Sequence, residues 1–372
     1  PLASITCPTG AVNVSPGSGS NIQNAVNAYP AGTAFCLGAG TFNITSAITP
    51  KTGDTFTGVY GAVLDASGWS TTDQTQGIFR ANNQDIDNVT IRNLVIRNSP
   101  QRGIHAYKDF SDRWVIDHNE IYGNRIGIMH GNYFQIRDNY IHDNWQYGIS
   151  SLDSTGSLIE NNEFAWNAAR WSSLSGDSAS SKWVQVSNTT VRANFVHDNY
   201  LHGIWFDGSL TGNVIDNNVV TRNGSVGIFY EVSGQGVISD NRVESNVGHG
   251  IFVSTSQNVE VYGNRLILNG GMGIQLFLDG SRSAYDLKNN YIHDNFVDAS
   301  DARLWSNHLA AAVSCINVVD GCVAASDSKN NRFVHNAYDV PSVDGGYFYF
   351  KGKQRTWAEW QADGNDTAGQ VS

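Results

Sequence analysis

The sequence lacks three features that would define a location or a site directly: a long apolar run, a block of basic residues and a closely spaced cysteine pair. Without an apolar run of bilayer length, no membrane helix is expected. The net charge of −11, with no basic block, argues against nucleic acid as a partner and against unaided capture of a polyanion. The chain begins at Pro1 rather than Met, which is typical of a processed product.

Cysteine is scarce, and the four residues Cys7, Cys36, Cys315 and Cys322 show no CxxC spacing. This spacing argues against zinc, and no metal or cofactor is predicted from it. Pairing as Cys7–Cys36 and Cys315–Cys322 would give two local disulfides, as suits a secreted protein. Four cysteines allow three pairings, and the sequence alone does not choose among them.

Asparagine and glycine, in contrast, recur with a period. The hexapeptide Asn, any residue, an aliphatic or aromatic residue, two further residues, Asn occurs at a basic period of 20 to 26 residues. Its copies begin at 93, 119, 139, 162, 194, 218, 241, 264, 290 and 331, and Gly-Ile lies between copies at 77, 103, 127, 148, 203, 227, 250 and 273. Such a period, without helical segments, is typical of stacked strands. Asn tolerates left-handed corners and can hydrogen-bond along a ladder.

The repeat predicts an all-β fold, a single-stranded right-handed parallel β-helix that forms one domain over residues 1–372. Residues 1–60 are expected to hold an N-terminal cap and the first turns. The β-helix turns are expected over residues 61–340, and a C-terminal cap over residues 341–372.

Both ends of the chain match the caps that a stack of strands requires. Residues 18–42 read as a short amphipathic helix, with Ser20 as its N-cap, followed by a strand. Residues 345–366 read as a hairpin strand and a short helix. These segments are expected to cover the two open ends.

Function has to come from positions that depart from the repeat. If the Ile of each Gly-Ile points inward, the second and fourth residues after Gly point outward. These outward pairs are His105/Tyr107, Met129/Gly131, Ser150/Leu152, Trp205/Asp207, Phe229/Glu231, Phe252/Ser254 and Gln275/Phe277. Three successive turns carry exposed aromatics with two acids beside them, an arrangement that suits sugar rings.

The two acids, Asp207 and Glu231, are predicted to lie one turn apart, with Cα atoms about 5 Å apart. Carboxyl groups about 5–5.5 Å apart are the arrangement of a retaining glycosidase. Crowding raises the pKa of one carboxyl group, as a proton donor requires. A cation site and a pair of solvated acids are the alternatives.

The longest insertion, residues 165–188, is a Ser-rich loop, and long loops in compact folds tend to be functional. It re-enters the stack at Lys182, one turn before Asp207. Lys182 is predicted to lower the pKa of the acids, bind substrate or act as a base, against the alternative of an ordinary surface lysine. The expected sugar contacts are Trp205, Phe229, His202, Trp183, Tyr230, Trp171 and Arg170.

The histidines are interpreted mainly as scaffold. His142, His197 and His293 occupy the same slot of the repeat, and recurrence favours a structural role. His130 falls on the inward phase and is expected in the core. No set of histidines has the spacing of a metal triad.

Residues 180–233 resemble the secreted right-handed parallel β-helix proteins of the pectate-lyase-like superfamily, whose pattern runs Lys, VRxNxVHDN, GIWxD and GIFxExS. The matching positions are Lys182, Arg192, Asn194, His197, Asp198, Asn199, Trp205, Asp207, Glu231 and Ser233. The resemblance covers roughly residues 75–280 and implies the fold. The superfamily includes lyases, glycoside hydrolases, uronan epimerases and phage adhesins, so it does not choose the function. The Ser-rich insert before Lys182 stands where the family has a small residue pair.

The favoured prediction is a secreted, monomeric glycoside hydrolase without a cofactor, acting on a plant or microbial polysaccharide or oligosaccharide. Asp207 and Glu231 would share the roles of nucleophile and acid/base. The alternative is a polysaccharide lyase or C5-epimerase, with Lys182 as base and the two acids holding Ca²⁺. A third possibility is a non-catalytic glycan-binding protein, which would keep the aromatics without needing paired acids.

Overall fold

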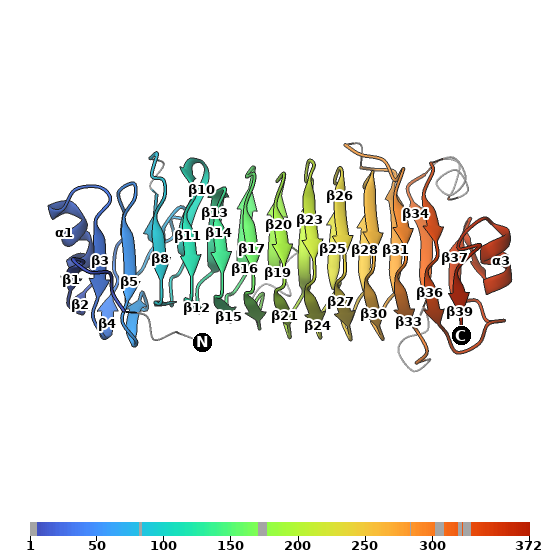
Figure 1. Ribbon diagram of the computed structural model, residues 1–372, viewed down its shortest axis with the longest axis horizontal. Helices are drawn as coiled ribbons and strands as arrows, with labels where there is room; N and C mark the ends of the chain where they lie inside the picture. Colours follow the sequence, from blue (N-terminus) through green and yellow to red (C-terminus); the bar gives the residue numbers. More distant parts are fainter. Residues whose placement is uncertain are drawn as a thin grey trace. The chain divides into compact units, whose positions relative to one another are not determined.

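The computed structural model describes residues 6–81, 84–169, 177–282, 284–301, 309–318, 322 and 329–372. The chain forms two compact units, Pro1–Lys182 and Trp183–Ser372. In each unit, short strands stack in parallel into three sheets, here called A, B and C, and one strand from each sheet makes one coil (Figure 1). This is the predicted parallel β-helix. That the whole chain is one domain stays a prediction.

The strands of the first unit follow one another in sequence order within each sheet. Sheet A holds β1 (Val12–Val14), β3 (Ala34–Leu37), β5 (Thr55–Gly58), β8 (Thr90–Arg92), β11 (Val115–Asp117), β14 (Gln135–Arg137) and β17 (Leu158–Glu160). Sheet B holds β2 (Gly17–Ser18), β4 (Gly40–Asn43), β6 (Ala62–Asp65), β9 (Val95–Arg97), β12 (Glu120–Tyr122), β15 (Tyr140–His142) and β18 (Glu163–Ala165). Sheet C holds β7 (Gly77–Arg80), β10 (Arg102–Asp112), β13 (Ile126–Asn132) and β16 (Tyr147–Leu152).

The second unit repeats this order, and β19 (Ala179–Val184) contains the boundary between the units. Sheet A holds β20 (Thr190–Arg192), β23 (Asn213–Asp216), β26 (Gly236–Ser239), β29 (Val259–Tyr262), β32 (Tyr291–His293) and β35 (Arg332–Val334). Sheet B holds β21 (Phe195–His197), β24 (Val219–Thr221), β27 (Arg242–Glu244), β30 (Arg265–Ile267), β33 (Phe296–Asp298), β36 (Ala337–Asp339) and β39 (Gln370–Val371). Sheet C holds β22 (His202–Asp207), β25 (Ile228–Glu231), β28 (Ile251–Ser254), β31 (Ile274–Asp279), β34 (Ala311–Ile316), β37 (Phe348–Phe350) and β38 (Lys353–Arg355).

Inward side chains stack in register to form the core. On sheet C of the second unit, Ile204, Ile228, Ile251 and Ile274 follow one another on successive strands, and all four are fully buried. Stacking like residues at the strand spacing buries apolar area evenly along the coil axis, which is the main stabilising term of such a fold.

The asparagine repeat divides its two expected roles between neighbouring residues. Asn217 takes the left-handed conformation at the corner, with φ of 58°. The next residue, Asn218, donates from its side chain to Oδ1 of Asn241 at 2.9 Å, and Asn241 donates in turn to Asn264 at 3.0 Å. The ladder satisfies buried polar groups at these corners, so the predicted Asn stacking is confirmed.

The last two copies of the hexapeptide lie on a different sheet from the others. The copy at 139–144 contains β15 of sheet B, whereas the identical copy at 290–295 contains β32 of sheet A. The prediction that His293 shares a slot with His142 and His197 is therefore wrong. Each coil carries two strands bounded by Asn, one in sheet A and one in sheet B. After a longer connection, the hexapeptide therefore matches the sheet-A strand instead of the sheet-B strand.

The caps form largely as predicted. Helix α1 (Ser20–Ala28) lies beside the first strands of the first unit and buries Ile22 and Val26 (Figure 1). Its N-cap is Gly19 rather than Ser20, which is the first helical residue, so that assignment was wrong by one position. In the second unit, β37 and β38 form an antiparallel hairpin, and α3 (Trp357–Ala362) buries Trp360 completely.

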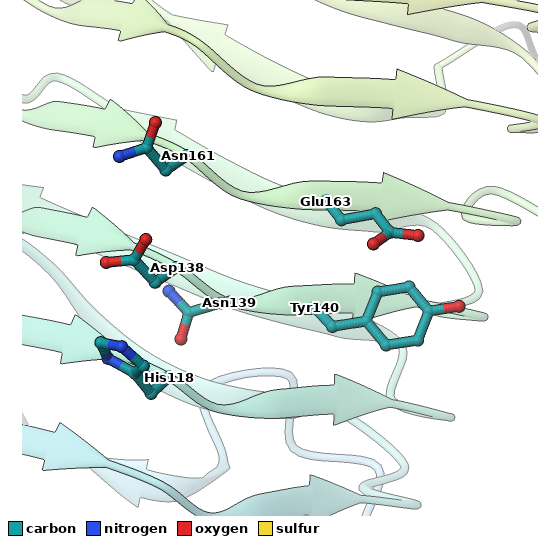
Figure 2. Close-up of a pocket in the computed structure, with 6 residues that line it drawn as sticks. All are labelled: His118, Asp138, Asn139, Tyr140, Asn161 and Glu163. Carbon is teal, nitrogen blue, oxygen red and sulfur yellow. The ribbon is translucent and has the colours of Figure 1, made fainter. Parts of the chain in front are cut away.

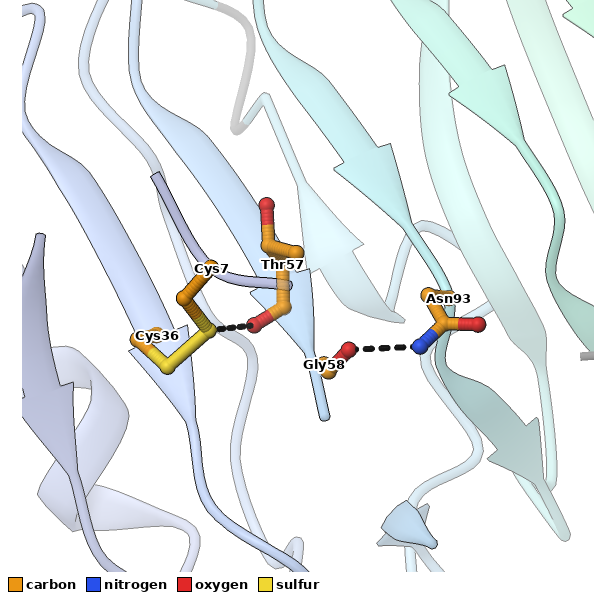
Figure 3. The surroundings of a disulfide bond; sticks show 5 residues. All are labelled: Cys7, Cys36, Thr57, Gly58 and Asn93. Atoms are coloured by element: carbon orange, nitrogen blue, oxygen red, sulfur yellow. Dashed lines mark hydrogen bonds between the residues drawn. A yellow bond between two sulfur atoms is a disulfide. The ribbon is translucent and has the colours of Figure 1, made fainter. Parts of the chain in front are cut away.

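Two disulfides are present, Cys7–Cys36 and Cys315–Cys322, which is the pairing considered from the sequence. Cys7 anchors the N-terminal segment to β3, and its sulfur lies 3.7 Å from the carbonyl oxygen of Thr57 (Figure 3). Next to this contact, the Asn93 side chain donates to the Gly58 carbonyl oxygen at 2.6 Å. No helix in the described ranges is long and apolar enough to cross a membrane.

Candidate functional site

The outward face of sheet C in the second unit carries the residues that depart from the repeat. Two columns cross β22, β25, β28 and β31 in register. One column is Trp205, Phe229, Phe252 and Gln275, and the other is Asp207, Glu231, Ser254 and Phe277. Strand alternation thus places the predicted aromatics and acids side by side. We call this surface the sheet-C face.

The aromatic rings of the sheet-C face cover one another. Trp205 and Phe229 stack with centroids 5.3 Å apart and planes 13° apart, and Phe229 stacks on Phe252 at 4.9 Å. Trp205 is 7% exposed and Phe229 8%. The prediction of exposed aromatic platforms is therefore wrong for these two rings, because ring faces at strand spacing pack on each other. Their contact with a sugar stays a prediction.

Two histidines flank this aromatic column. The ring of His202 lies 5.0 Å from Trp205 and 5.4 Å from Phe229. His249 occupies the same position before its Gly-Ile, lies 5.0 Å from Phe252 and was missed in the sequence. Burial lowers the pKa of His249 to about 4, and its Nδ1 accepts the Met272 backbone N–H at 2.9 Å. His249 is therefore a neutral, fixed ring at neutral pH.

Glu231 is held by two nitrogen donors. Its Oε2 accepts from Trp205 Nε1 at 3.1 Å, and its Oε1 lies 3.2 Å from a guanidinium nitrogen of Arg282. Donors of this kind stabilise the ionised carboxylate and fix its orientation. Arg282 is about half exposed and also lies 3.9 Å from Asp279. It follows β31 in a connection without repeat character, so no signal in the sequence pointed to it.

Asp207 pairs with Glu231 on the neighbouring strand, as its spacing predicted. Asp207 is half-buried, whereas Glu231 is 9% exposed. Two carboxylates on adjacent strands of one outward face provide the elements of glycosyl transfer: one group to attack or stabilise the anomeric carbon, and one to exchange a proton. Within the described ranges, no group of three or more His, Cys, Asp or Glu side chains could hold a metal ion.

Lys182 ends the first unit and is not an ordinary surface lysine. It is 7% exposed, and its Nζ lies 2.6 Å from Asp177 Oδ1. Asp177 also accepts from the Tyr147 hydroxyl at 2.8 Å. Burial raises the pKa of Asp177, but the bonds to Lys182 and Tyr147 outweigh it and lower that pKa. The catalytic role of Lys182 stays a prediction.

Two of the predicted sugar contacts lie in the core instead. Trp183 is fully buried and stacks on Phe206 at 5.0 Å. Tyr230 is also fully buried and donates its hydroxyl to the Gln235 carbonyl oxygen at 3.3 Å. Both side chains point inward because they occupy the other phase of their strands. The predictions for Trp183 and Tyr230 are wrong.

Other predicted positions have different outcomes. Arg170 and Trp171 lie outside the described residues. His130 is fully buried in the core, as expected. On sheet B, His142 stacks on Tyr140 at 4.0 Å and bonds Asp143 at 2.7 Å, in agreement with its predicted scaffold role.

Comparison with known proteins places this geometry in a family. The model of a family described as "right handed beta helix region" matches residues 64–167, 126–297 and 183–356, which together span 64–356 of the 372 residues. The match confirms the predicted fold class. The sequence matches no curated protein.

Several solved structures are similar to this chain. The A-module of mannuronan C-5 epimerase AlgE6 from Azotobacter vinelandii has a TM-score of 0.66 and 15% identity, covering 98% of this chain and 96% of that one. XylC in complex with xylose has a TM-score of 0.66 and 12% identity, covering 94% and 82%. The periplasmic alginate epimerase AlgG has a TM-score of 0.55 and 17% identity, covering 82% and 83%. At these identities the likeness is one of fold.

Proposed function

The chain belongs to the right-handed β-helix family, and we propose that it is a secreted glycoside hydrolase that binds a polysaccharide or oligosaccharide on the sheet-C face. The observation that carries the proposal is the pairing of Asp207 with Glu231 in register on that face. The names of similar structures, a mannuronan C-5 epimerase, an alginate epimerase and a xylose complex, support a carbohydrate substrate. The two disulfides support an extracellular location.

The two carboxylates have different surroundings, and these support different roles. Glu231, which contacts Trp205 Nε1 and the Arg282 guanidinium, is the proposed nucleophile. Asp207 donates a proton to the glycosidic oxygen while Glu231 attacks the anomeric carbon, and the leaving sugar departs as an alcohol. Asp207, now a carboxylate, then takes a proton from water. The water oxygen attacks the anomeric carbon and releases Glu231.

A panel of neutral and uronic polysaccharides tests this proposal through new reducing ends and through the ultraviolet absorbance of unsaturated products. We expect reducing ends without that absorbance, unaffected by EDTA, and retention of the anomeric configuration. Glu231→Gln and Asp207→Asn are each expected to lower kcat by at least about a hundredfold. Glu244→Gln, a carboxylate on sheet B of the same unit, is the matched control. Binding without turnover of any glycan would instead indicate a non-catalytic glycan-binding protein.

One observation favours a second candidate, a uronan C5-epimerase or lyase. Arg282 adds a half-exposed guanidinium to the sheet-C face, and guanidinium groups bind carboxylates well. The Arg282 guanidinium contacts Glu231, one of the two acids that the lyase hypothesis assigned to Ca²⁺. The second candidate therefore neutralises the uronate with Arg282 rather than with calcium at Glu231.

Arg282→Gln separates the two candidates. If Arg282 only orients Glu231 in a hydrolase, kcat falls and KM for a neutral glycan stays near the wild-type value. If Arg282 binds a uronate, KM for the uronan rises, and the unsaturated or epimerised product is lost together with affinity. Product analysis by NMR spectroscopy distinguishes hydrolysis, elimination and epimerisation in the same samples.

A further inference from the structure

A second surface of the first unit has the features of a binding site. A hollow of about 310 Å³ lies at the bend between sheets A and B, and Figure 2 shows its lining. The lining residues are His118, Asp138, Asn139, Tyr140, Asn161 and Glu163. They come from three successive coils: the bends after β11, β14 and β17, and the strands β15 and β18. None of these residues belongs to sheet C.

The bend itself explains why polar side chains gather there. His118, Asp138 and Asn161 occupy equivalent corner positions, with φ of 56°, 55° and 55°. Asn, Asp and His are the non-glycine residues that tolerate this conformation best. Figure 2 shows these three side chains in one column along the bend, with Tyr140 and Glu163 on the adjoining strands.

Several polar groups of the hollow have no partner within the protein. In the described part of the chain, the Asp138 carboxylate, the Asn161 amide and the Tyr140 hydroxyl make no hydrogen bond to another side chain or to the backbone. His118 Nδ1 has no hydrogen-bond partner there, although it lies 3.9 Å from Asp117 Oδ1. Asn139 differs, because its amide donates to Ile116 at 2.8 Å within the ladder. The hollow therefore offers donors and acceptors on a rigid base.

Tyr140 is fixed by its neighbour. Its ring stacks on His142 at 4.0 Å, and His142 bonds Asp143 at 2.7 Å and Glu120 at 3.3 Å. Burial raises the pKa of Tyr140 to about 12, with nearby acids such as Glu163 adding to the effect. The hydroxyl therefore stays protonated and available as a donor, on a ring that loses little freedom when a ligand binds.

We propose that this hollow binds a neutral saccharide of one or two sugar rings. Its volume is near the lower end of ligand pockets, about 300–1,000 Å³. Sugar hydroxyls can donate to Asp138 and Glu163 and exchange hydrogen bonds with Asn161. An aromatic ring edged by such groups suits the C–H surface of a sugar. The two carboxylates repel a uronate, so the site selects neutral glycans. This inference does not depend on the proposed catalytic role of the sheet-C face.

Calorimetric titration of the Glu231→Gln variant, which is expected to leave glycans intact, tests the site. The probes are cellohexaose, xylohexaose, mannohexaose and an oligomannuronate. We expect at least one neutral probe to bind, and Tyr140→Ala in the same background to weaken that binding at least about tenfold. Asp138→Ala is expected to weaken it as well.

Tyr291→Ala is the matched control, because Tyr291 stacks on His293 at 4.2 Å and His293 bonds Asp294 at 2.7 Å and Glu260 at 3.1 Å. It reproduces the Tyr–His packing of Tyr140 away from the hollow, and we expect it to bind like the Glu231→Gln parent. Three results would overturn the inference: no neutral probe binds, Tyr140→Ala binds like Tyr291→Ala, or the binding lost in Tyr140→Ala favours the oligomannuronate.

Failure of this inference and failure of the proposed function give different results. Tyr140→Ala with Glu231 intact is expected to cleave short soluble substrates at the wild-type rate. A Glu231→Gln variant that still turns over substrate refutes the catalytic proposal and leaves the hollow as a binding site. Glycan binding by Tyr140→Ala equal to that by Tyr291→Ala does the reverse, because it refutes the hollow as a binding site and leaves the catalytic proposal standing.

Discussion

Replacing Asn218 by alanine tests the ladder that holds the corners of the second unit. Asn218 is 1% exposed. Its amide donates to the Val191 carbonyl oxygen at 2.9 Å and to Asn241, while its Oδ1 accepts the Asn194 backbone N–H at 3.0 Å. Alanine leaves that backbone N–H and that carbonyl unpaired in the core. At about 1–3 kcal/mol for each unpaired group, the expected loss is about 2–6 kcal/mol in the free energy of unfolding.

Urea unfolding, followed by circular dichroism and tryptophan fluorescence, measures this loss where the two transitions coincide. Arg242→Ala is the control, because Arg242 lies in the adjacent coil but is 55% exposed and makes a surface ion pair with Glu244 at 2.7 Å. Such a pair is worth at most about 1 kcal/mol. A loss for Asn218→Ala no larger than that for Arg242→Ala would refute the view that the ladder, rather than apolar stacking alone, holds the corner.

Three further changes test other parts of the structure. Trp205→Phe removes the indole hydrogen bond to the proposed nucleophile, so kcat should fall while KM is unchanged in steady-state assays; a change in KM alone would contradict this. Trp360→Ala opens the buried C-terminal cap and should cost about 3–5 kcal/mol in urea unfolding; a smaller cost than for Arg242→Ala would contradict its role. Burial lowers the pKa of His142, but bonds to Glu120 and Asp143 outweigh it and raise that pKa above 6.5. The stability lost in His142→Gln should therefore be largest below pH 6.5 and shrink as pH rises through the raised folded value, and a difference independent of pH would refute this.

The fold was predictable because every coil solves the same local problem. Each corner needs a residue that tolerates positive φ and another whose side-chain amide hydrogen-bonds the buried backbone groups. Asn meets both requirements, which explains why it recurs. The one error of register, at His293, has a physical origin. In sheets A and B alike, the strands end at such corners. After a longer connection, the hexapeptide can therefore match a strand of sheet A instead of sheet B, with the same spacing between its two Asn residues.

The site was predictable only where it lies on the repeat. The 24-residue spacing of Asp207 and Glu231 is the coil length, and register pairing follows from it. Strand alternation points Trp205 outward and Tyr230 inward. Tyr230 was predicted to contact sugar because it is aromatic, although its position on the strand already placed it in the core. Arg282 could not be found in this way, because its position depends on the path of a connection rather than on strand geometry.

The buried aromatic column of the sheet-C face orients the indole of Trp205. Rings stacked at strand spacing cover part of one another's faces, and Phe229 thereby fixes the rotamer of Trp205. The indole N–H is thereby aimed at Glu231, with Arg282 on the other carboxylate oxygen. A carboxylate whose two oxygens are both held by donors has a fixed orientation for attack on the anomeric carbon. It is poorly suited to donating and accepting a proton. Asp207 is the more exposed of the two acids, and this difference supports the proton-transfer role proposed for it.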